Sequence, residues 1–292
     1  MTEPVDACRE RRFDLPGRGG DMAALEFGPA DRPVGLVFSH ANGFNARTYR
    51  SILAPIARDF RILAIDMRGH GRTRLPTVTE GRLSWEDARD DLLALLAREA
   101  LTNVVLGGHS MGATVSLLAA AEAPERVRGL VLFEPVIPAS TAFAAGRTGE
   151  APDSGLVLGA LRRRTVFPSR AEAIAAYAGR GPFRRWSDAM LADYVADGFR
   201  DRQDGTVELA CAPEWEVSNY LSQAHDCWGT LARAPGPIRV FMASDHPACS
   251  AELATTAIAA GRLGVETVAE TSHFLPMERP DLVQRALAAA MA

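Results

Sequence analysis

A serine flanked by glycines is the residue in this sequence best suited to nucleophilic chemistry. Ser110 lies in Gly108-His109-Ser110-Met111-Gly112, between an apolar run typical of a strand and an Ala/Leu-rich segment typical of a helix. A Gly-x-Ser-x-Gly turn needs glycine two residues before and two after the serine, because the strand and helix backbones approach too closely there for a Cβ atom. The motif in this context therefore indicates Ser110 as a nucleophile.

The hydroxyl of a serine becomes reactive when a base takes its proton, and an imidazole with a pKa near neutrality suits that role. Of the six histidines, His273 follows the last predicted strand, from where it could reach Ser110 across the sheet edge. His246 lies next to Asp245, the carboxylate favoured below as the partner of the base, and has no obvious orienting group of its own. We assign the base to His273. Three other histidines are interpreted as groups that hydrogen-bond loop backbone, namely His40, His70 and His109.

Such a base needs a carboxylate that fixes its tautomer and stabilises the imidazolium. Asp245 follows the apolar run IRVFMAS directly and gives the chain order serine, aspartate, histidine. Glu134 follows the preceding strand-like run in LVLFEP and could approach His273 from the neighbouring strand end. We favour Asp245 and keep Glu134 as the alternative acid, whereas Asp66, which ends the run RILAID, is assigned to loop structure.

Attack on a carbonyl group creates an oxyanion, which backbone N–H groups must already face. The residue after the nucleophile, Met111, offers its N–H at the start of a predicted helix, where the helix dipole also favours negative charge. The second donor is expected from the loop His40-Ala41-Asn42-Gly43. We choose the backbone N–H of Asn42, with Gly43 as the alternative if the loop is shifted by one residue.

The elements that must hold these residues alternate along the chain. Two short strand-like pieces near the start, at 12–15 and 22–27, predict an antiparallel edge. Short apolar runs ending at Ser39, Asp66, Gly108 and near Pro135 then alternate with helical segments, and the alternation returns at Pro237. Continuously apolar runs of this kind indicate parallel strands that are covered by helices on both faces.

The alternation is interrupted by a long, mostly helical stretch with one strand-like piece, TVELA. We predict a core domain formed by residues 1–137 and 232–292 and a helical cap formed by residues 138–231. Residues 138–186 contain eight arginines against three acidic residues. These charges indicate either solvated faces that pair with one another or a basic mouth for substrates that carry a carboxylate or thioester.

Composition excludes several classes of function. The chain has 292 residues, is 47% hydrophobic and 23% charged, carries a net charge of −4, and contains no lysine, so Schiff-base chemistry and a P-loop lysine are ruled out. The absence of metal-ligand spacing predicts no metal and no cofactor. The lack of basic clusters argues against nucleic acid, and the lack of long apolar runs argues against a membrane span or signal peptide, so we expect a cytoplasmic protein.

These residues resemble the landmarks of the α/β-hydrolase superfamily along nearly the whole core. HANGF stands where members often show an HG-type oxyanion motif, and DMRGHGRT, GHSMG and SHFLPMERPD are similar to other landmarks in the same order. Ala41 stands where glycine is usual in the superfamily, so this chain departs from the family pattern in the loop that is expected to bind the oxyanion. The resemblance implies an α/β-hydrolase fold, with a mostly parallel twisted sheet, helices on both faces and a helical cap inserted after the sixth strand.

The resemblance also narrows the chemistry. Epoxide hydrolases and haloalkane dehalogenases of this fold use an aspartate nucleophile where this chain has Ser110. Hydroxynitrile lyases of the fold rely on a lysine, which this chain does not contain. We therefore expect a serine hydrolase that cleaves a small or medium carboxylic ester or a related small-molecule acyl substrate. A thioesterase, an acyltransferase or a carbon–carbon hydrolase with the same triad stays open, as does a ligand-binding receptor built on this fold.

Overall fold

A computed structural model describes residues 8–146 and 149–292, with a central eight-stranded sheet of order β1-β2-β4-β3-β5-β6-β10-β11. The two first strands are antiparallel to their neighbours, and all pairs from β4 to β11 are parallel. The strands are β1 Cys8–Leu15, β2 Gly20–Phe27, β3 Val34–Ser39, β4 Arg61–Ile65, β5 Val104–His109, β6 Val127–Phe133, β10 Ile238–Ala243 and β11 Leu263–Val268. The predicted antiparallel edge and parallel sheet are confirmed.

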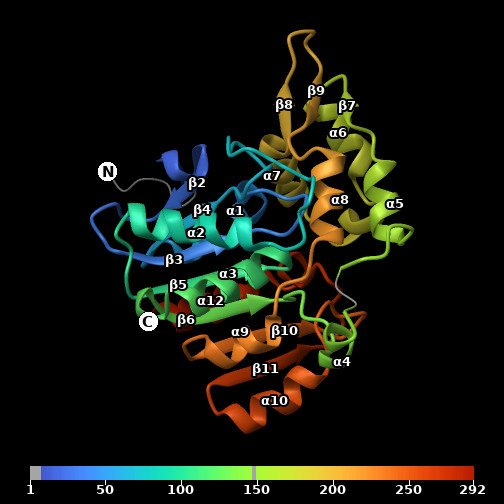
Figure 1. Ribbon diagram of the computed structural model, residues 1–292. Coiled ribbons are helices and arrows are strands. Elements are labelled where there is room, and N and C mark those ends of the chain that lie inside the picture. The colour runs from blue at the N-terminus through green and yellow to red at the C-terminus, as the bar shows by residue number, and fades with distance from the viewer. Residues whose placement is uncertain (1–7, 147–148) are drawn as a thin grey trace.

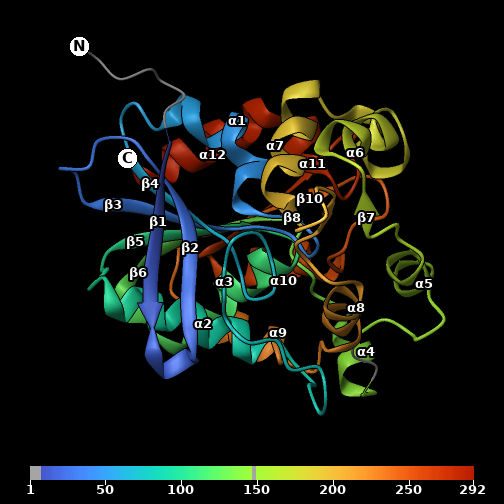
Figure 2. The ribbon, with the colours of Figure 1, turned by 90° about the horizontal axis from the view of Figure 1, so that it is seen from above.

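Helices cover both faces of this sheet, as Figures 1 and 2 show. One layer contains α1 Arg50–Leu53, flanked by 3-10 turns, and α12 Pro280–Met291. The other layer contains α2 Glu86–Arg98, α3 Met111–Glu122, α9 Cys227–Arg233 and α10 Glu252–Ala260. The helical segment expected between the apolar runs that end at Ser39 and Asp66 is broken into short turns, because Pro55 cannot donate a backbone hydrogen bond.

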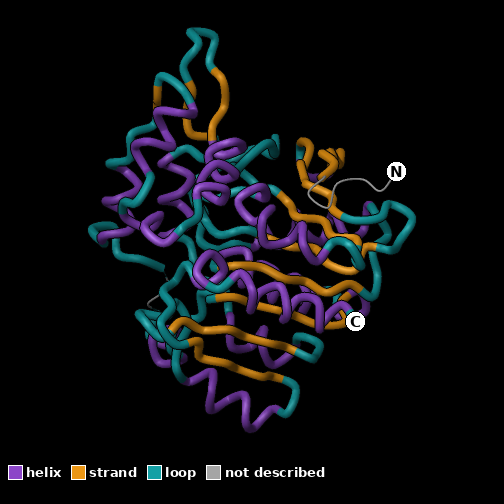
Figure 3. Tube along the Cα trace, turned by 180° about the vertical axis from the view of Figure 1, so that it is seen from behind, coloured by secondary structure: helices purple, strands orange, loops and turns teal. Residues whose placement is uncertain are grey.

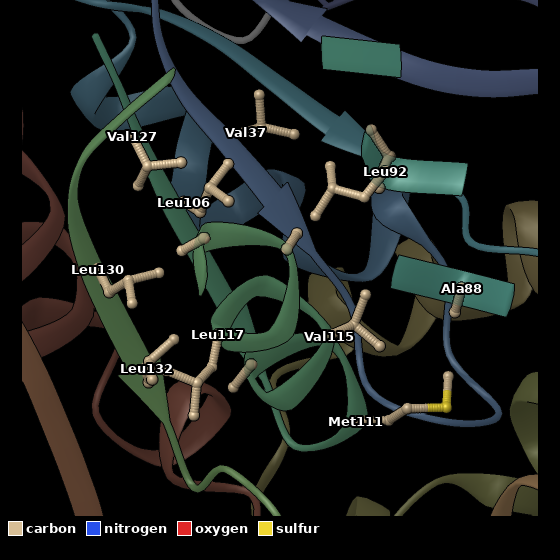
Figure 4. Packing of buried hydrophobic residues seen from close by; sticks show 14 of the residues in the cluster. Val37, Ala88, Leu92, Leu106, Met111, Val115, Leu117, Val127, Leu130 and Leu132 are labelled. Atoms are coloured by element: carbon tan, nitrogen blue, oxygen red, sulfur yellow. The ribbon is translucent and has the colours of Figure 1, made fainter. Parts of the chain in front are cut away.

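Buried side chains of the strands alternate between the two layers. On β6, Leu130 and Leu132 belong to the hydrophobic cluster under α2 and α3, whereas Val131 and Phe133 belong to the cluster under α1 and α12. Successive strand residues point to opposite faces, so a strand that is covered on both sides is apolar throughout. Figure 4 shows Leu117 of α3 packed over the β6 leucines.

An insertion between β6 and β10 begins with α4 Ser140–Ala144, which lies on the core side of the molecule (Figure 1), where the N–H of Ser140 donates to Glu252 of α10. The elements that follow form a cap on one side of the core, namely α5 Gly155–Leu161, β7 Val166–Phe167, α6 Arg170–Tyr177, α7 Asp188–Gly198, β8 Phe199–Asp201, β9 Val207–Leu209 and α8 Pro213–Leu221. The three short strands form a separate small sheet, and the turn between β8 and β9 projects farthest from the core (Figures 1 and 3). TVELA contributes β9, whereas β7 and β8 were not predicted from the sequence.

The predicted division of the chain at residue 231 places α9 in the cap, but this helix packs on the core. Its Cys227 and Leu231 are buried in the same hydrophobic cluster as α3. The chain therefore returns to the core after α8, before α9 begins. No helix in the described ranges is both long enough and apolar enough to cross a membrane.

Candidate active site

The turn between β5 and α3 holds Ser110 in a strained backbone conformation. Its φ is +55°, a region that few non-glycine residues adopt, and its side chain is nearly buried. The flanking glycines are required by space. A Cβ on Gly108 would lie 2.6 Å from the carbonyl carbon of Gly112, and one on Gly112 would lie 2.3 Å from the backbone oxygen of Ser39. The close approach of strand and helix that the motif predicts is present.

The imidazole of His273 lies beside the hydroxyl of Ser110. Its Nε2 is 2.9 Å from Ser110 Oγ. His273 stands in the loop after β11, just before the short helix α11 Leu275–Glu278, which brings a residue 163 positions away to the end of β5. At this distance the imidazole can accept the hydroxyl proton directly.

The carboxylate behind His273 belongs to Glu134. Its Oε2 is 3.1 Å from His273 Nδ1, and its side chain is fully buried at the end of β6. The backbone N–H groups of Ala243 and Ala248 donate to the two carboxylate oxygens. These bonds fix the carboxylate in position.

The prediction that Asp245 partners His273 is therefore wrong, and the alternative acid, Glu134, occupies that position. The Asp245 side chain is 69% exposed, and its carboxylate lies 3.4 Å from Nε2 of His246, whose side chain is 98% exposed. The loop after β10 turns outward at these two residues and then directs the N–H of Ala248 toward Glu134. Both acids follow adjacent strands and precede His273 in the chain, so chain order could not separate them.

The backbone N–H groups of Asn42 and Met111 are among those near Ser110 that have no acceptor in the described part of the chain. The neighbours of Asn42 are engaged: Ala41 N–H donates to the Tyr49 hydroxyl, and Gly43 N–H donates to His70 Nε2 at 3.0 Å. The alternative donor, Gly43, thus already has a partner. Asn42 lines the same cavity as Ser110, so its free N–H is available to a ligand there.

Two buried histidines and one aspartate hold the loops beside Ser110 by hydrogen bonds to their backbone, in agreement with the roles expected for these residues. His40 Nε2 accepts from Met67 N–H, and Asp66 accepts from the backbone N–H groups of Ala46 and Arg72. Burial lowers the pKa of His70 to about 4, so its ring is neutral and Nε2 can accept. The loops are held by neutral imidazoles together with the Asp66 carboxyl group.

A chain of hydrogen bonds joins the loop that carries Ala41 and Asn42 to the loop that carries His273. The Tyr49 hydroxyl accepts from Ala41 N–H and is 2.7 Å from His109 Nδ1, and His109 Nε2 is 2.7 Å from the backbone oxygen of His273. Because a carbonyl only accepts, His109 carries its proton on Nε2 and accepts from Tyr49 at Nδ1. Tyr49 and His109 are both fully buried.

A cavity of about 490 Å³ opens between these residues and the cap. Ser110, His273 and Asn42 form its floor, and α5, α6, α7 and α8 supply its walls. The aromatic lining residues are Phe44, Tyr177, Phe183, Tyr194, Tyr220 and Phe274. The charged ones besides His273 are Arg163, Arg180 and Glu216, none of which could be assigned from the sequence, because arginines are abundant throughout the cap.

The side chain of Asn42 connects the floor of this cavity to the cap. Its Nδ2 donates to the backbone oxygen of Glu216 at 3.0 Å, and its Oδ1 accepts from Asn219 Nδ2 at 2.8 Å. Both partners lie on α8. The position of one free N–H near Ser110 therefore depends on a helix of the cap.

The fold agrees with comparison to known proteins. The chain belongs to the α/β hydrolase family, whose model matches residues 36–286. A 2-(acetamidomethylene)succinate hydrolase of Mesorhizobium japonicum is 31% identical over 99 residues, which is 34% of this chain and 34% of that protein. The match thus spans about a third of that relative's length.

Two further similarities extend over the whole chain. A haloalkane dehalogenase of Bradyrhizobium diazoefficiens is 25% identical over 305 residues, covering 99% of this chain and 95% of that protein. The solved structure of an E-2-(acetamidomethylene)succinate hydrolase has a TM-score of 0.80 at 20% identity, covering 98% of this chain and 99% of that one. The likeness of the structures shows a common fold, and the family assignment makes this protein an α/β hydrolase.

Proposed function

We propose that the protein is a serine hydrolase that cleaves a carboxylic ester or a related acyl substrate through a Ser110–His273–Glu134 triad. One observation carries the proposal. The nucleophile and base atoms lie 2.9 Å apart, and a fully buried carboxylate lies 3.1 Å from the other ring nitrogen of the base. This is the arrangement in which each group performs its role in acyl transfer.

The steps follow from the positions of these groups. Ser110 Oγ attacks the acyl carbon while its proton moves to His273 Nε2, and Glu134 stabilises the imidazolium through Nδ1–H. The resulting oxyanion accepts from the N–H groups of Met111 and Asn42, each worth roughly 3 kcal/mol of transition-state stabilisation. His273 then protonates the leaving alcohol. Water, deprotonated by His273, releases the acid and restores Ser110.

The same residues support other acyl chemistry. A thioester, transfer of the acyl group to another alcohol, or cleavage of a carbon–carbon bond next to a carbonyl would use the same nucleophile and base. A halide displacement of the kind named for the haloalkane dehalogenase relative has less support, because enzymes of this fold that perform it use an aspartate where this chain has serine. A binding receptor is the alternative of another class, and it requires no turnover.

Labelling of the serine with a fluorophosphonate probe tests the proposal. We expect the wild type to be labelled covalently and Ser110→Ala to be inert, with Ser140→Ala, a change at an exposed serine of α4, as the matched control that stays labelled. An unlabelled wild type would contradict an activated serine and favour the receptor.

Turnover is tested separately with p-nitrophenyl esters of graded acyl length. We expect hydrolysis that depends on Ser110 and His273, with a preference that reports how much of the cavity the acyl chain fills. Labelling without turnover of any ester in the series would contradict the ester substrate while keeping the reactive serine.

A further inference from the structure

Two arginines and one glutamate are the fixed charges of the cavity lining, which is otherwise mainly aromatic and aliphatic. Two guanidinium groups against one carboxylate leave an excess of one positive charge on the lining of the cavity. An excess of one sign of charge in a cleft with apolar walls raises the local concentration of ligands of the opposite sign. The balance of the cavity therefore points to an anionic group on the molecule that fills it.

The first guanidinium, that of Arg163, is held in place by cap residues. NH1 donates to Glu216 Oε2 at 2.6 Å, and NH2 donates to the Tyr194 hydroxyl at 2.7 Å. These two bonds use two of the five N–H groups of the guanidinium. A Cβ built on Gly43 would lie 3.4 Å from Arg163 NH1, so this fixed donor stands over the loop that carries Asn42.

The second guanidinium, that of Arg180, is not paired with an acid in the described part of the chain. Arg180 follows α6, its side chain is exposed at the rim of the cavity, and NH1 makes a weak 3.4 Å contact with the backbone oxygen of Ala176. Because Glu216 compensates Arg163, the excess charge belongs to Arg180. Its planar fork of donors matches a carboxylate in two parallel hydrogen bonds.

On the basis of the function proposed above, we propose that the natural substrate is an acyl compound that carries a carboxylate away from the bond that is cleaved. The scissile carbonyl lies at Ser110 and the aliphatic part of the substrate packs against Leu156, Phe183 and Phe274. The carboxylate meets Arg180 at the rim, and the Arg163 guanidinium adds donors from the wall. This arrangement selects monoesters of dicarboxylic acids, or esters of alcohols that bear an acid, over neutral esters.

Matched pairs of charged and neutral esters test this specificity. Monoethyl glutarate is compared with diethyl glutarate for a carboxylate on the acyl side, and 4-acetoxybenzoate with its methyl ester for one on the alcohol side. We expect the wild type to show a higher kcat/KM for the charged member of at least one pair. In Arg180→Gln the charged-to-neutral ratio of kcat/KM should fall roughly tenfold or more, as loss of one charged hydrogen bond implies.

The control is Arg184→Gln, which removes an exposed arginine of the same turn that does not line the cavity; its ratio should equal that of the wild type. Arg163 is tested with its partner, as Arg163→Met with Glu216→Gln, so that no buried charge is left alone. We expect this double variant to lower the ratio too, with circular dichroism confirming its fold.

The outcomes separate this inference from the function on which it rests. Turnover of neutral esters with no Arg180-dependent preference in either pair would overturn the carboxylate site and leave the serine hydrolase standing. If no ester is cleaved at all, calorimetric titration of Ser110→Ala with glutarate decides. Binding that is lost in the Ser110→Ala, Arg180→Gln double variant supports the carboxylate site, and no binding in Ser110→Ala itself overturns it.

Discussion

His109 Nε2–H donates to the backbone oxygen of His273 across 2.7 Å, so the residue before the proposed nucleophile holds the residue that we propose as its base. Burial, with a smaller effect of the nearby His273, lowers the pKa of His109 to about 3. The ring therefore stays neutral near pH 7 and keeps both of its roles, as acceptor from Tyr49 and donor to His273. His109 is a positioning residue, since its contacts reach the catalytic groups through the backbone.

Replacement of His109 should separate positioning from folding. We expect His109→Leu to lower kcat roughly 10- to 100-fold with little change in KM, because a small displacement of the base costs about that much. His109→Gln, whose amide can still donate to His273, should recover much of the loss. Equal losses in the two variants, or a change confined to KM, would contradict the positioning role; both are measured by steady-state kinetics on one ester.

Replacement of the two acids should give unequal losses. Glu134→Gln keeps the shape of the side chain but removes the charge that orients His273, and we expect kcat to fall by about 10⁴, the loss seen when the triad acid becomes an amide in serine proteases. Asp245→Asn alters an exposed carboxylate and should stay within about twofold of the wild type. A larger loss at Asp245 than at Glu134 in parallel assays would reverse the assignment.

Gly112 should tolerate no side chain. A Cβ there would lie 2.3 Å from the Ser39 oxygen and 2.4 Å from the His40 oxygen, which are backbone atoms of the β3 end and the oxyanion loop. We expect Gly112→Ala to lower the free energy of unfolding by about 3 kcal/mol or more and to abolish labelling of Ser110. Gly17→Ala, where a Cβ meets nothing within 4 Å, is the control and should be nearly neutral. Equal denaturation midpoints for the two variants would refute the close approach.

Stability should fall as the pH is lowered from neutrality. Burial lowers the pKa of His70 and His225 to about 4 and of His109 to about 3, and it lowers the pKa of His40 well below its usual value. Below about pH 6.5 the unfolded chain therefore binds protons that the folded chain refuses. As the pH falls, each such histidine lowers the free energy of unfolding by up to about 1.4 kcal/mol per pH unit, until its folded-state pKa is reached.

Two carboxyl groups, those of Asp66 and Asp193, work in the opposite direction, because burial raises the pKa of each. Burial raises the pKa of Asp66 to about 6, so the folded chain takes up this proton before the unfolded chain does, and this offsets the effect of one histidine. We expect urea denaturation to show a clear net loss of stability between pH 7 and pH 5. His246→Gln, which changes an exposed ring, should show the same loss, and a flat profile for the wild type would contradict the neutral buried histidines.

The sequence predicts the core of this protein well because its signals are local. The glycines around Ser110 predict the close approach of β5 and α3, and the apolar runs predict that both faces of the sheet are covered. The structure has both features. The choice between Glu134 and Asp245 depends on the direction of a loop after β10, which no periodicity encodes. The cap is harder still: β7 and β8 are two and three residues long, too short to produce a pattern.

The side-chain amide of Asn42, whose backbone N–H we propose as an oxyanion donor, is joined to helix α8 by two hydrogen bonds. Any displacement of α8 would break both bonds and release the loop that carries Asn42. A substitution in the cap that moves this helix should therefore slow the reaction even where it leaves every atom of the triad unchanged.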